Sequence, residues 1–145
     1  MNGDLTTITN LLLAFILGGL IGWFREKEKK TAGMRTHTLV ALGSALFMVI
    51  SRDMMSLTGI ADPGRIAAGV VTGIGFIGAG CIMQTGSGIT GITTAASIFV
   101  TSAIGIAAGA GFYVSSVTGT ALTIATLQIL RLLEVHVIKT KHHEE

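Results

Sequence analysis

The chain has 145 residues, of which 50% are hydrophobic and only 12% are charged, with a net charge of +2. Soluble domains carry about 25% charged residues, so this composition excludes an ordinary water-soluble globular protein. The small net charge gives no support for nucleic-acid binding, and the single cysteine, Cys81, excludes an internal disulfide.

Ionisable side chains are absent from a long central stretch of the chain. No Asp, Glu, Lys, Arg or His occurs in the 65 residues from Ile66 to Leu130. One membrane span needs roughly 20 apolar residues to cross about 30 Å of hydrocarbon, so this stretch predicts three spans joined by short neutral turns. Together with two earlier apolar segments, it predicts an all-α fold, a polytopic membrane helix bundle with about five transmembrane helices.

The first half of the chain contains two of the predicted spans. The first covers residues 5–24 and is followed by a strongly charged segment. No lysine or arginine precedes it, so we expect no cleavable signal peptide. The second covers residues 36–51 and is short, because only sixteen residues separate Arg35 from Arg52. The long side chains of these arginines can reach the membrane surface.

A loop over residues 52–65 is expected to enter the third span. Asp62 and Pro63 have the pattern of a helix start, an N-cap acceptor followed by proline at the first helical position. Beyond that span, the glycine-rich stretch 84–92 predicts a tight turn or a re-entrant segment.

The remaining boundaries follow from the hydrophobic runs and the turns between them. The last three predicted spans cover residues 66–83, 93–111 and 112–130, and a charged tail covers residues 131–145. The bundle of residues 1–130 and this short tail, expected in the cytoplasm, make up the whole chain.

Basic residues predict the orientation in the membrane. Eight of the ten lie in the first charged segment or in the tail. They are Arg25, Lys27, Lys29, Lys30, Arg35, Arg131, Lys139 and Lys141. Since short cytoplasmic segments of membrane proteins are enriched in lysine and arginine, the N-terminus is expected outside and the C-terminus in the cytoplasm.

Glycines at helical spacing predict close helix packing. Three pairs of glycines are four residues apart within predicted spans. The pairs are Gly18 with Gly22, Gly69 with Gly73, and Gly105 with Gly109. Such faces let two helix backbones approach. They serve most often within one chain, and they also suit a seam between two copies, so we expect a homodimer.

Hydroxyl groups take the place of charges in the central stretch. Ten threonines and five serines lie between Ile66 and Leu130. They can line a polar path for a cation or, more commonly, bond to carbonyls of their own helix. Paired carboxylates and nucleophile motifs are missing from the sequence, so we expect no enzyme and no cofactor. A magnesium cage usually needs carboxylates, which the last three spans lack, and a metal site stays unassigned.

The charged segment after the first span allows three interpretations. Basic clusters at a membrane surface usually anchor lipid headgroups. The same segment can instead be a docking strip for a partner protein, or it can contribute Arg25, Glu26, Arg35 and His37 to a functional cluster.

Three ordered strings resemble the MgtC/SapB family of membrane proteins. They are REKEKKTAGMRTHTLVALGSALF (25–47), DPGRIAAGVVTGIGFIGAG (62–80) and GITTAASIF (91–99), and the resemblance covers about residues 18–111. It implies a bacterial inner-membrane protein linked to magnesium homeostasis and, in pathogens, to virulence. Longer members look like regulators of other membrane proteins and carry a soluble C-terminal domain. This chain looks like a short, SapB-type member without that domain.

The resemblance also implies which residues to consider as the functional site. These are Glu26, Arg35, Thr36, His37, Asp62, Arg65, Thr93 and Thr94, and Arg25 from the charged segment completes the list of candidates. One departure is Phe24, which stands where members of the family often have an acidic residue. The absence of that acidic residue weakens the case for a cation site at the end of the first span.

These observations lead to a functional expectation with two alternatives. We expect a non-enzymatic membrane protein that supports magnesium or ion homeostasis by acting on other membrane proteins. The first alternative is a transporter or channel for magnesium or another cation, and the second is a structural protein that organises lipid.

Overall fold

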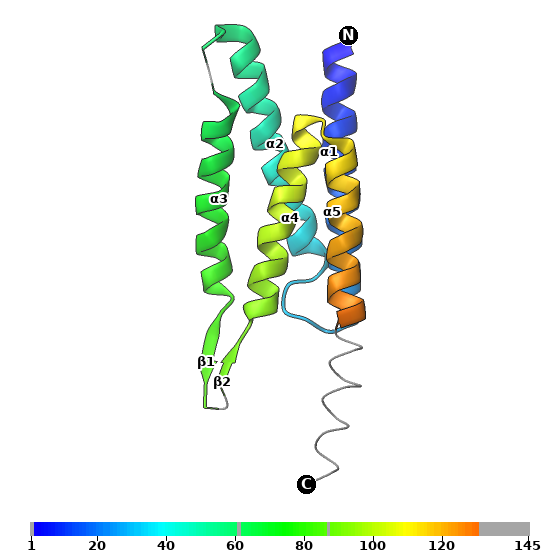
Figure 1. The fold of residues 1–145 in the computed structure, drawn as a ribbon, viewed down its shortest axis with the longest axis vertical. Coiled ribbons are helices and arrows are strands. Elements are labelled where there is room, and N and C mark those ends of the chain that lie inside the picture. Colours follow the sequence, from blue (N-terminus) through cyan, green and yellow to red (C-terminus); the bar gives the residue numbers. More distant parts are fainter. Residues whose placement is uncertain (1, 61, 87, 131–145) are drawn as a thin grey trace.

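A computed structural model describes residues 2–60, 62–86 and 88–130, and these form one helical bundle with a small hairpin at one end (Figure 1). The helices are α1 (Asn2–Lys27), α2 (Met34–Thr58), α3 (Pro63–Gly80), α4 (Ile92–Ala110) and α5 (Tyr113–Ala125), and the strands are β1 (Met83–Thr85) and β2 (Gly88–Thr90). A π-helical turn, η1 (Thr126–Leu130), extends α5.

The structure confirms the predicted all-α membrane bundle. Four helices are long and apolar enough to cross a membrane, namely α1, α2, α4 and α5 continued by η1. The remaining helix, α3, has 18 residues and is not one of these four. It nevertheless carries the chain back across the bundle, because α2 ends at one end and α4 begins at the other (Figure 1). The chain therefore passes along the bundle five times.

The second helix is longer than the predicted span of residues 36–51. It continues for seven residues beyond Ser51, to Thr58, so Arg52 and Asp53 belong to the helix and not to a loop. The Nη1 atom of Arg52 donates to the carbonyl oxygen of Gly109 over 3.0 Å. This bond gives the guanidinium a partner at the end of the bundle, so its charge does not stop the helix.

The connections around α3 follow local rules that the sequence displays. The carboxylate of Asp62 accepts a hydrogen bond of 2.8 Å from the N–H of Gly64, which confirms the predicted N-cap. After α3, the predicted tight turn takes the form of an antiparallel hairpin in which Met83 pairs with Thr90. The helix ends at Gly80, before residue 83 where the predicted span ended, because the hairpin begins there.

One cluster of the buried core consists of small residues from three helices. Ala14 on α1, Ala45 on α2 and Ala108 on α4 are fully buried and pack together. A Cβ atom added to Gly105 would collide with the carbonyl oxygen of Ala41, and one added to Gly109 would collide with that of Ala45. The backbones of α2 and α4 are therefore in direct contact.

The glycine pair of α1 lies against α2 in the same way. A Cβ atom on Gly18 would lie 2.6 Å from that of Ala41, and one on Gly22 would lie 2.5 Å from the Cα of Met34. Lipid chains are as apolar as the helix side chains, so helices in a membrane gain no hydrophobic driving force by associating. Dispersion contacts at close approach of this kind hold them together instead. Helices α1, α2 and α4 form the tightly packed centre of the molecule.

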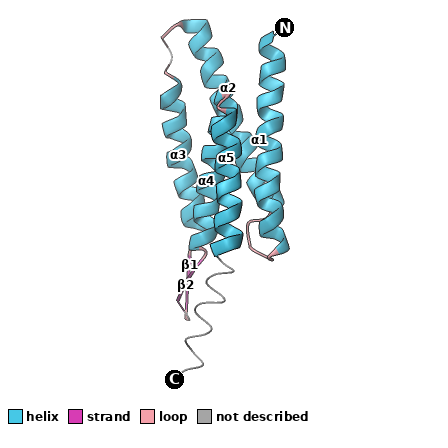
Figure 2. Ribbon diagram, turned by 45° about the vertical axis from the view of Figure 1, so that its right-hand side comes forward, coloured by secondary structure: helices cyan, strands magenta, loops and turns pink. Residues whose placement is uncertain are grey.

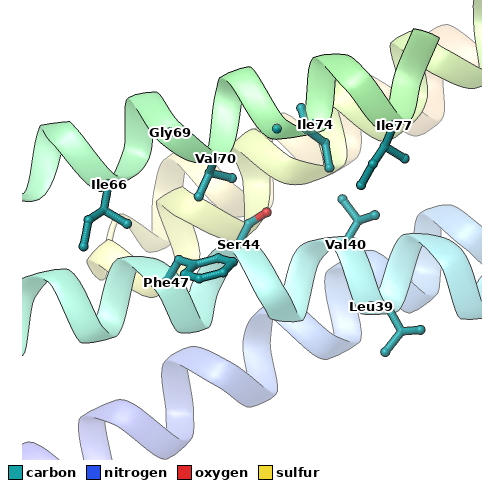
Figure 3. A pocket seen from close by; sticks show the side chains of 10 residues that line it. Leu39, Val40, Ser44, Phe47, Ile66, Gly69, Val70, Ile74 and Ile77 are labelled. Atoms are coloured by element: carbon teal, nitrogen blue, oxygen red, sulfur yellow. The ribbon is translucent and has the colours of Figure 1, made fainter. Parts of the chain in front are cut away.

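The glycine pair of α3 has a different environment. No atom of another element lies within 4 Å of a Cβ placed on Gly69 or Gly73. Both glycines line an apolar groove of about 760 Å³ between α2 and α3, whose walls include Val40, Phe47 and Ile74 (Figure 3). Helix α3 is therefore held loosely against α2.

Candidate functional site

Buried polar side chains gather at both ends of α4, where its neighbours supply their partners. The first group lies where α1 ends and where α2 and α4 begin. The second lies where α4 ends and α5 begins (Figures 1 and 2). Polar groups inside a membrane bundle are costly unless they are hydrogen-bonded, and ionisable ones are often functional.

Arg25 is the charged member of the first group. It stands in the last turn of α1, yet only 2% of it is exposed. Its Nη2 atom donates to the hydroxyl oxygen of Thr94 on α4 over 2.6 Å. A hydrogen bond from a charged donor is stronger than one between neutral groups. This contact joins α1 to the first turn of α4.

His37 is the second ionisable member, and it is fully buried. Its Nδ1 atom lies 2.9 Å from the carbonyl oxygen of Gly33, and its Nε2 atom lies 3.1 Å from the hydroxyl of Ser97. Because a carbonyl oxygen can only accept, Nδ1 carries a proton. Ser97 also lies 2.8 Å from the carbonyl oxygen of Thr94. The group is thus continuous from α1 through α4 to α2.

The Ser97 hydroxyl gives this group two complete hydrogen-bond patterns. A hydroxyl has one proton to donate, and here two acceptors are in reach, the Thr94 carbonyl oxygen and Nε2 of His37. With a neutral imidazole, Ser97 donates to Nε2. With an imidazolium, Nε2 donates to Ser97, which then donates to Thr94. Gain or loss of a proton at His37 is therefore linked to rotation of one hydroxyl.

Glu26 follows Arg25 in the sequence but has a different task. Its Oε2 atom accepts a hydrogen bond of 2.9 Å from the backbone N–H of Met34, the first residue of α2. The N-cap position is Gly33, which has no side chain to do this. A Cβ atom at Gly33 would lie 2.8 Å from Oε2 of Glu26. The glutamate therefore caps α2 from a distance, and the glycine leaves room for it.

The other residues proposed from the sequence lie apart from this group. Arg35 is exposed and Thr36 is half-buried in the first turn of α2, while Thr93 is exposed in the first turn of α4. Asp62 and Arg65 stand at the start of α3, at the opposite end of the bundle (Figure 1). Of the nine candidates, the structure brings three into one hydrogen-bonded group, namely Arg25, His37 and Thr94.

The second polar group contains residues that sequence reasoning missed. Asn10 on α1 is fully buried, and its amide donates to the carbonyl oxygen of Gly109 over 3.1 Å. The hydroxyl of Tyr113 donates to the side-chain oxygen of Asn10 over 2.8 Å. Gly109 also accepts from Arg52. One signal in the sequence could have identified Asn10: it is a single amide side chain inside the apolar first span. A buried amide in a membrane needs hydrogen-bond partners from neighbouring helices.

The hydroxyls of the last two helices mainly serve their own backbones. Thr101, Ser116, Thr120 and Thr123 each donate to a carbonyl three or four residues earlier. A pair that crosses between helices is Ser44 with Ser102, whose oxygens are 2.9 Å apart. Within the described ranges, no group of three or more His, Cys, Asp or Glu side chains is placed to hold a metal ion.

Comparison with known proteins gives a consistent result. The sequence model of the MgtC family matches residues 11–136. The chain is 45% identical over 141 residues to the protein named "Putative magnesium transporter YhiD" of Escherichia coli K12, covering 94% of this chain and 66% of that one. It is 43% identical over 120 residues to "Protein MgtC" of Brucella abortus (strain 2308), covering 83% of this chain and 49% of that one.

A third relative extends this pattern. "Protein MgtC" of Salmonella typhimurium (strain LT2) is 41% identical over 124 residues, covering 86% of this chain and 52% of that protein. The chain thus spans about two thirds of the YhiD relative and about half of the MgtC relatives. No solved structure matches the chain significantly.

Proposed function

This chain belongs to the MgtC family, and from that premise we propose that it is a non-enzymatic protein of the bacterial inner membrane that supports magnesium or ion homeostasis by regulating other membrane proteins. Its relatives carry names that refer to MgtC and to magnesium transport. Both the magnesium-related role and the regulatory mode of action are part of this proposal.

The buried Arg25 is the observation that carries the regulatory proposal. A guanidinium stays protonated in proteins, and this one lies inside the bundle at the beginning of α4. A fixed positive charge of this kind repels a divalent cation, and it does so more strongly where water is scarce. The backbones of α2 and α4 also touch in the centre of the bundle, at Gly105 and Gly109. A cation path between these helices would need them to separate.

A cation transporter is the second candidate. It is favoured by the printed name of the Escherichia coli relative and by the loose packing of α3 beside the groove at Gly69 and Gly73. Movement of α3 relative to the tight centre would be the structural basis of such transport.

Flux measurements separate the two candidates. The purified full chain is placed in sealed liposomes, and magnesium, sodium and proton fluxes are compared with empty vesicles and with vesicles that hold an ionophore. The regulatory proposal expects no flux above empty vesicles. Flux that is lost in a Thr93→Val or Asp62→Asn variant would establish transport and overturn the regulatory proposal.

A partner search then tests the regulatory role itself. Mild solubilisation of native membranes should recover a membrane protein in fixed ratio to this chain. Absence of both flux and a partner would contradict regulation and favour a structural role in organising lipid.

We also propose a homodimer that uses the open glycine face of α3. A Cβ atom added to Gly69 or Gly73 would meet nothing within 4 Å, and Phe76, two helical turns after Gly69 and on the same side of α3, is 84% exposed. In a Cys81→Ser background, cysteine at Phe76 should cross-link two copies in membranes. Cysteine at Phe15 on α1, which is 52% exposed, should not. Equal cross-linking at both positions would contradict this interface.

A further inference from the structure

We propose that the outer surface at the end of α1 binds the headgroups of anionic phospholipids. This basic strip consists of one aromatic and four basic residues, Trp23, Lys27, Lys29, Lys30 and Arg35. The inference does not depend on the proposed regulatory role. It rests on the positions of the charged side chains in residues 25–35, where the sequence contains both acidic and basic residues.

An aromatic ring places the first lysine at the membrane surface. Trp23 is 46% exposed near the end of α1, and the Nζ atom of Lys27 lies 4.0 Å from the centre of its ring. Tryptophan is enriched at the level of the lipid headgroups, and the face of its ring attracts a cation. Phe24 packs against the same indole, with ring centres 5.4 Å apart. Lys27 is therefore held at headgroup depth.

The two acidic residues of the segment each accept a hydrogen bond from a neighbouring element. The carboxylate of Glu26 accepts from the N–H of Met34, and that of Glu28 accepts from the side-chain amide of Gln128 over 2.7 Å. Both negative charges thus serve contacts with α2 or η1. Glu26 is itself exposed and Glu28 is half-buried, so the four exposed basic side chains still leave this surface with an excess of positive charge.

Of the five basic residues in this segment, one is buried and four are exposed. Arg25 is turned inward to Thr94, whereas Lys27, Lys29, Lys30 and Arg35 are all exposed. Within the residues that the structure describes, the side chains of these four form no ion pair or hydrogen bond. Their charges face the surroundings of the bundle.

The backbone holds two of these lysines in fixed positions. Lys29 has a φ of 55°, in the left-handed region, and its N–H donates to the carbonyl oxygen of Glu26 over 2.9 Å. The N–H of Lys30 donates to the carbonyl oxygen of Arg25 over 3.1 Å. These bonds close the end of α1 and turn the chain. The lysines therefore follow directly on the membrane-spanning helix.

A lipid headgroup fits this strip better than a soluble anion or an acidic protein. The strip lies at the end of a span, beside a tryptophan that marks the membrane interface. Anionic headgroups are present there at high local density, and the attraction of each basic side chain to such a surface adds to that of the others. Charge and location together select phosphatidylglycerol-like lipids.

Native mass spectrometry of the full chain in a neutral detergent tests the proposal. Phosphatidylglycerol and phosphatidylcholine are added separately, and bound lipid is counted. The wild type should bind phosphatidylglycerol at least about tenfold more tightly, and 0.5 M salt should remove most of that preference because exposed charges are screened. A variant with Lys27→Gln, Lys29→Gln, Lys30→Gln and Arg35→Gln should show no preference.

Matched variants guard against a folding defect and against other ligands. Replacing the same residues by Lys27→Arg, Lys29→Arg, Lys30→Arg and Arg35→Lys keeps the charge and should keep the preference, and Arg65→Gln at the other end of the bundle should have no effect. The proposal is overturned if the wild type shows no preference or if the glutamine variant retains it. It is also overturned if glycerol phosphate competes as well as the lipid, or if an acidic protein occupies the strip in its place.

Discussion

Neighbouring residues of one type can have opposite environments in a helix, and the first turn of α4 shows this clearly. Thr93 and Thr94 are adjacent in the sequence, yet Thr93 is exposed while Thr94 is 6% exposed and accepts the hydrogen bond from Arg25. Successive helical residues point about 100° apart, and at this end of α4 that rotation turns Thr94 to the core and Thr93 away from it. From the sequence, both threonines are equally good candidates for the functional site.

The two threonines are expected to differ in their contribution to stability. Thr94→Val removes the acceptor of a charged, buried donor, and the free energy of unfolding should fall by about 1.5–3 kcal/mol. Thr93→Val is the matched control and should change it by less than about 0.5 kcal/mol. Denaturation of the purified chain in detergent, followed by helical circular dichroism, measures both. Equal effects would show that the Arg25–Thr94 bond does not stabilise the bundle.

At the scale of helices, three glycine pairs with the same spacing have two different environments. Gly18, Gly22, Gly105 and Gly109 lie at backbone contacts, while the α3 pair faces an open groove. The spacing shows that a helix can pack closely at these positions. It does not show against which partner, because that depends on how the helices are arranged.

This difference predicts opposite effects of adding one methyl group. Gly105→Ala places its Cβ against the carbonyl oxygen of Ala41, a backbone atom that cannot rotate away. Overpacking of this kind should lower the free energy of unfolding by about 1–3 kcal/mol. Gly69→Ala, with nothing within 4 Å, should be neutral or raise it by up to about 1 kcal/mol, since alanine favours helix. The same denaturation assay measures both, and equal losses would contradict the packing described.

The junction between the hairpin and α4 contains a position that only glycine fits. Gly91 has a φ of +90°, and a Cβ atom there would collide with the carbonyl oxygen of Cys81. Gly91→Ala should displace the backbone at Cys81 and increase the rate at which its thiol reacts with a maleimide by roughly tenfold or more, which corresponds to an opening free energy lowered by about 1.4 kcal/mol or more. Gly86→Ala, at an open position of the hairpin, should leave the rate unchanged. An unchanged rate in both variants would show that the hairpin tolerates the added Cβ.

The whole molecule passes along the bundle five times, and this path predicts which loops share a side of the membrane. The connection between α1 and α2 lies at the same end as the hairpin, while the connection between α2 and α3 lies at the other end (Figure 1). Sidedness itself is our proposal, based on the distribution of basic residues. The tail of residues 131–145, part of that argument, lies outside the described residues.

Cysteine labelling tests the five passages and the orientation together. In a Cys81→Ser background, single cysteines are placed at Thr31, Gly86 and Ile60, which are all exposed. A maleimide that cannot cross membranes should label Ile60→Cys in intact cells, and it should label the other two only after permeabilisation. Labelling of Ile60→Cys and Gly86→Cys from the same side would show that α3 does not cross the membrane. The reverse pattern would preserve the five passages and invert the orientation.

Some structural features could be predicted because their causes are local. The absence of ionisable side chains between Ile66 and Leu130 can be read directly from the sequence, and it is sufficient to predict that these residues lie in lipid. The N-cap at Asp62 and the turn before α4 depend on a few consecutive residues, and the structure has both. The length of α2 was underestimated because Arg52 finds its partner 57 residues away.

The sequence by itself determined that this protein lies in a membrane, that it is an all-α bundle and that it belongs to its family. This was possible because hydrophobicity and local backbone preferences are properties of consecutive residues. Only the tertiary structure decided that Arg25 turns inward while Lys27 stays outside, that His37 reaches Ser97, and that one glycine pair remains open. Those outcomes depend on which helix lies opposite, and that is set by the packing of all the helices together.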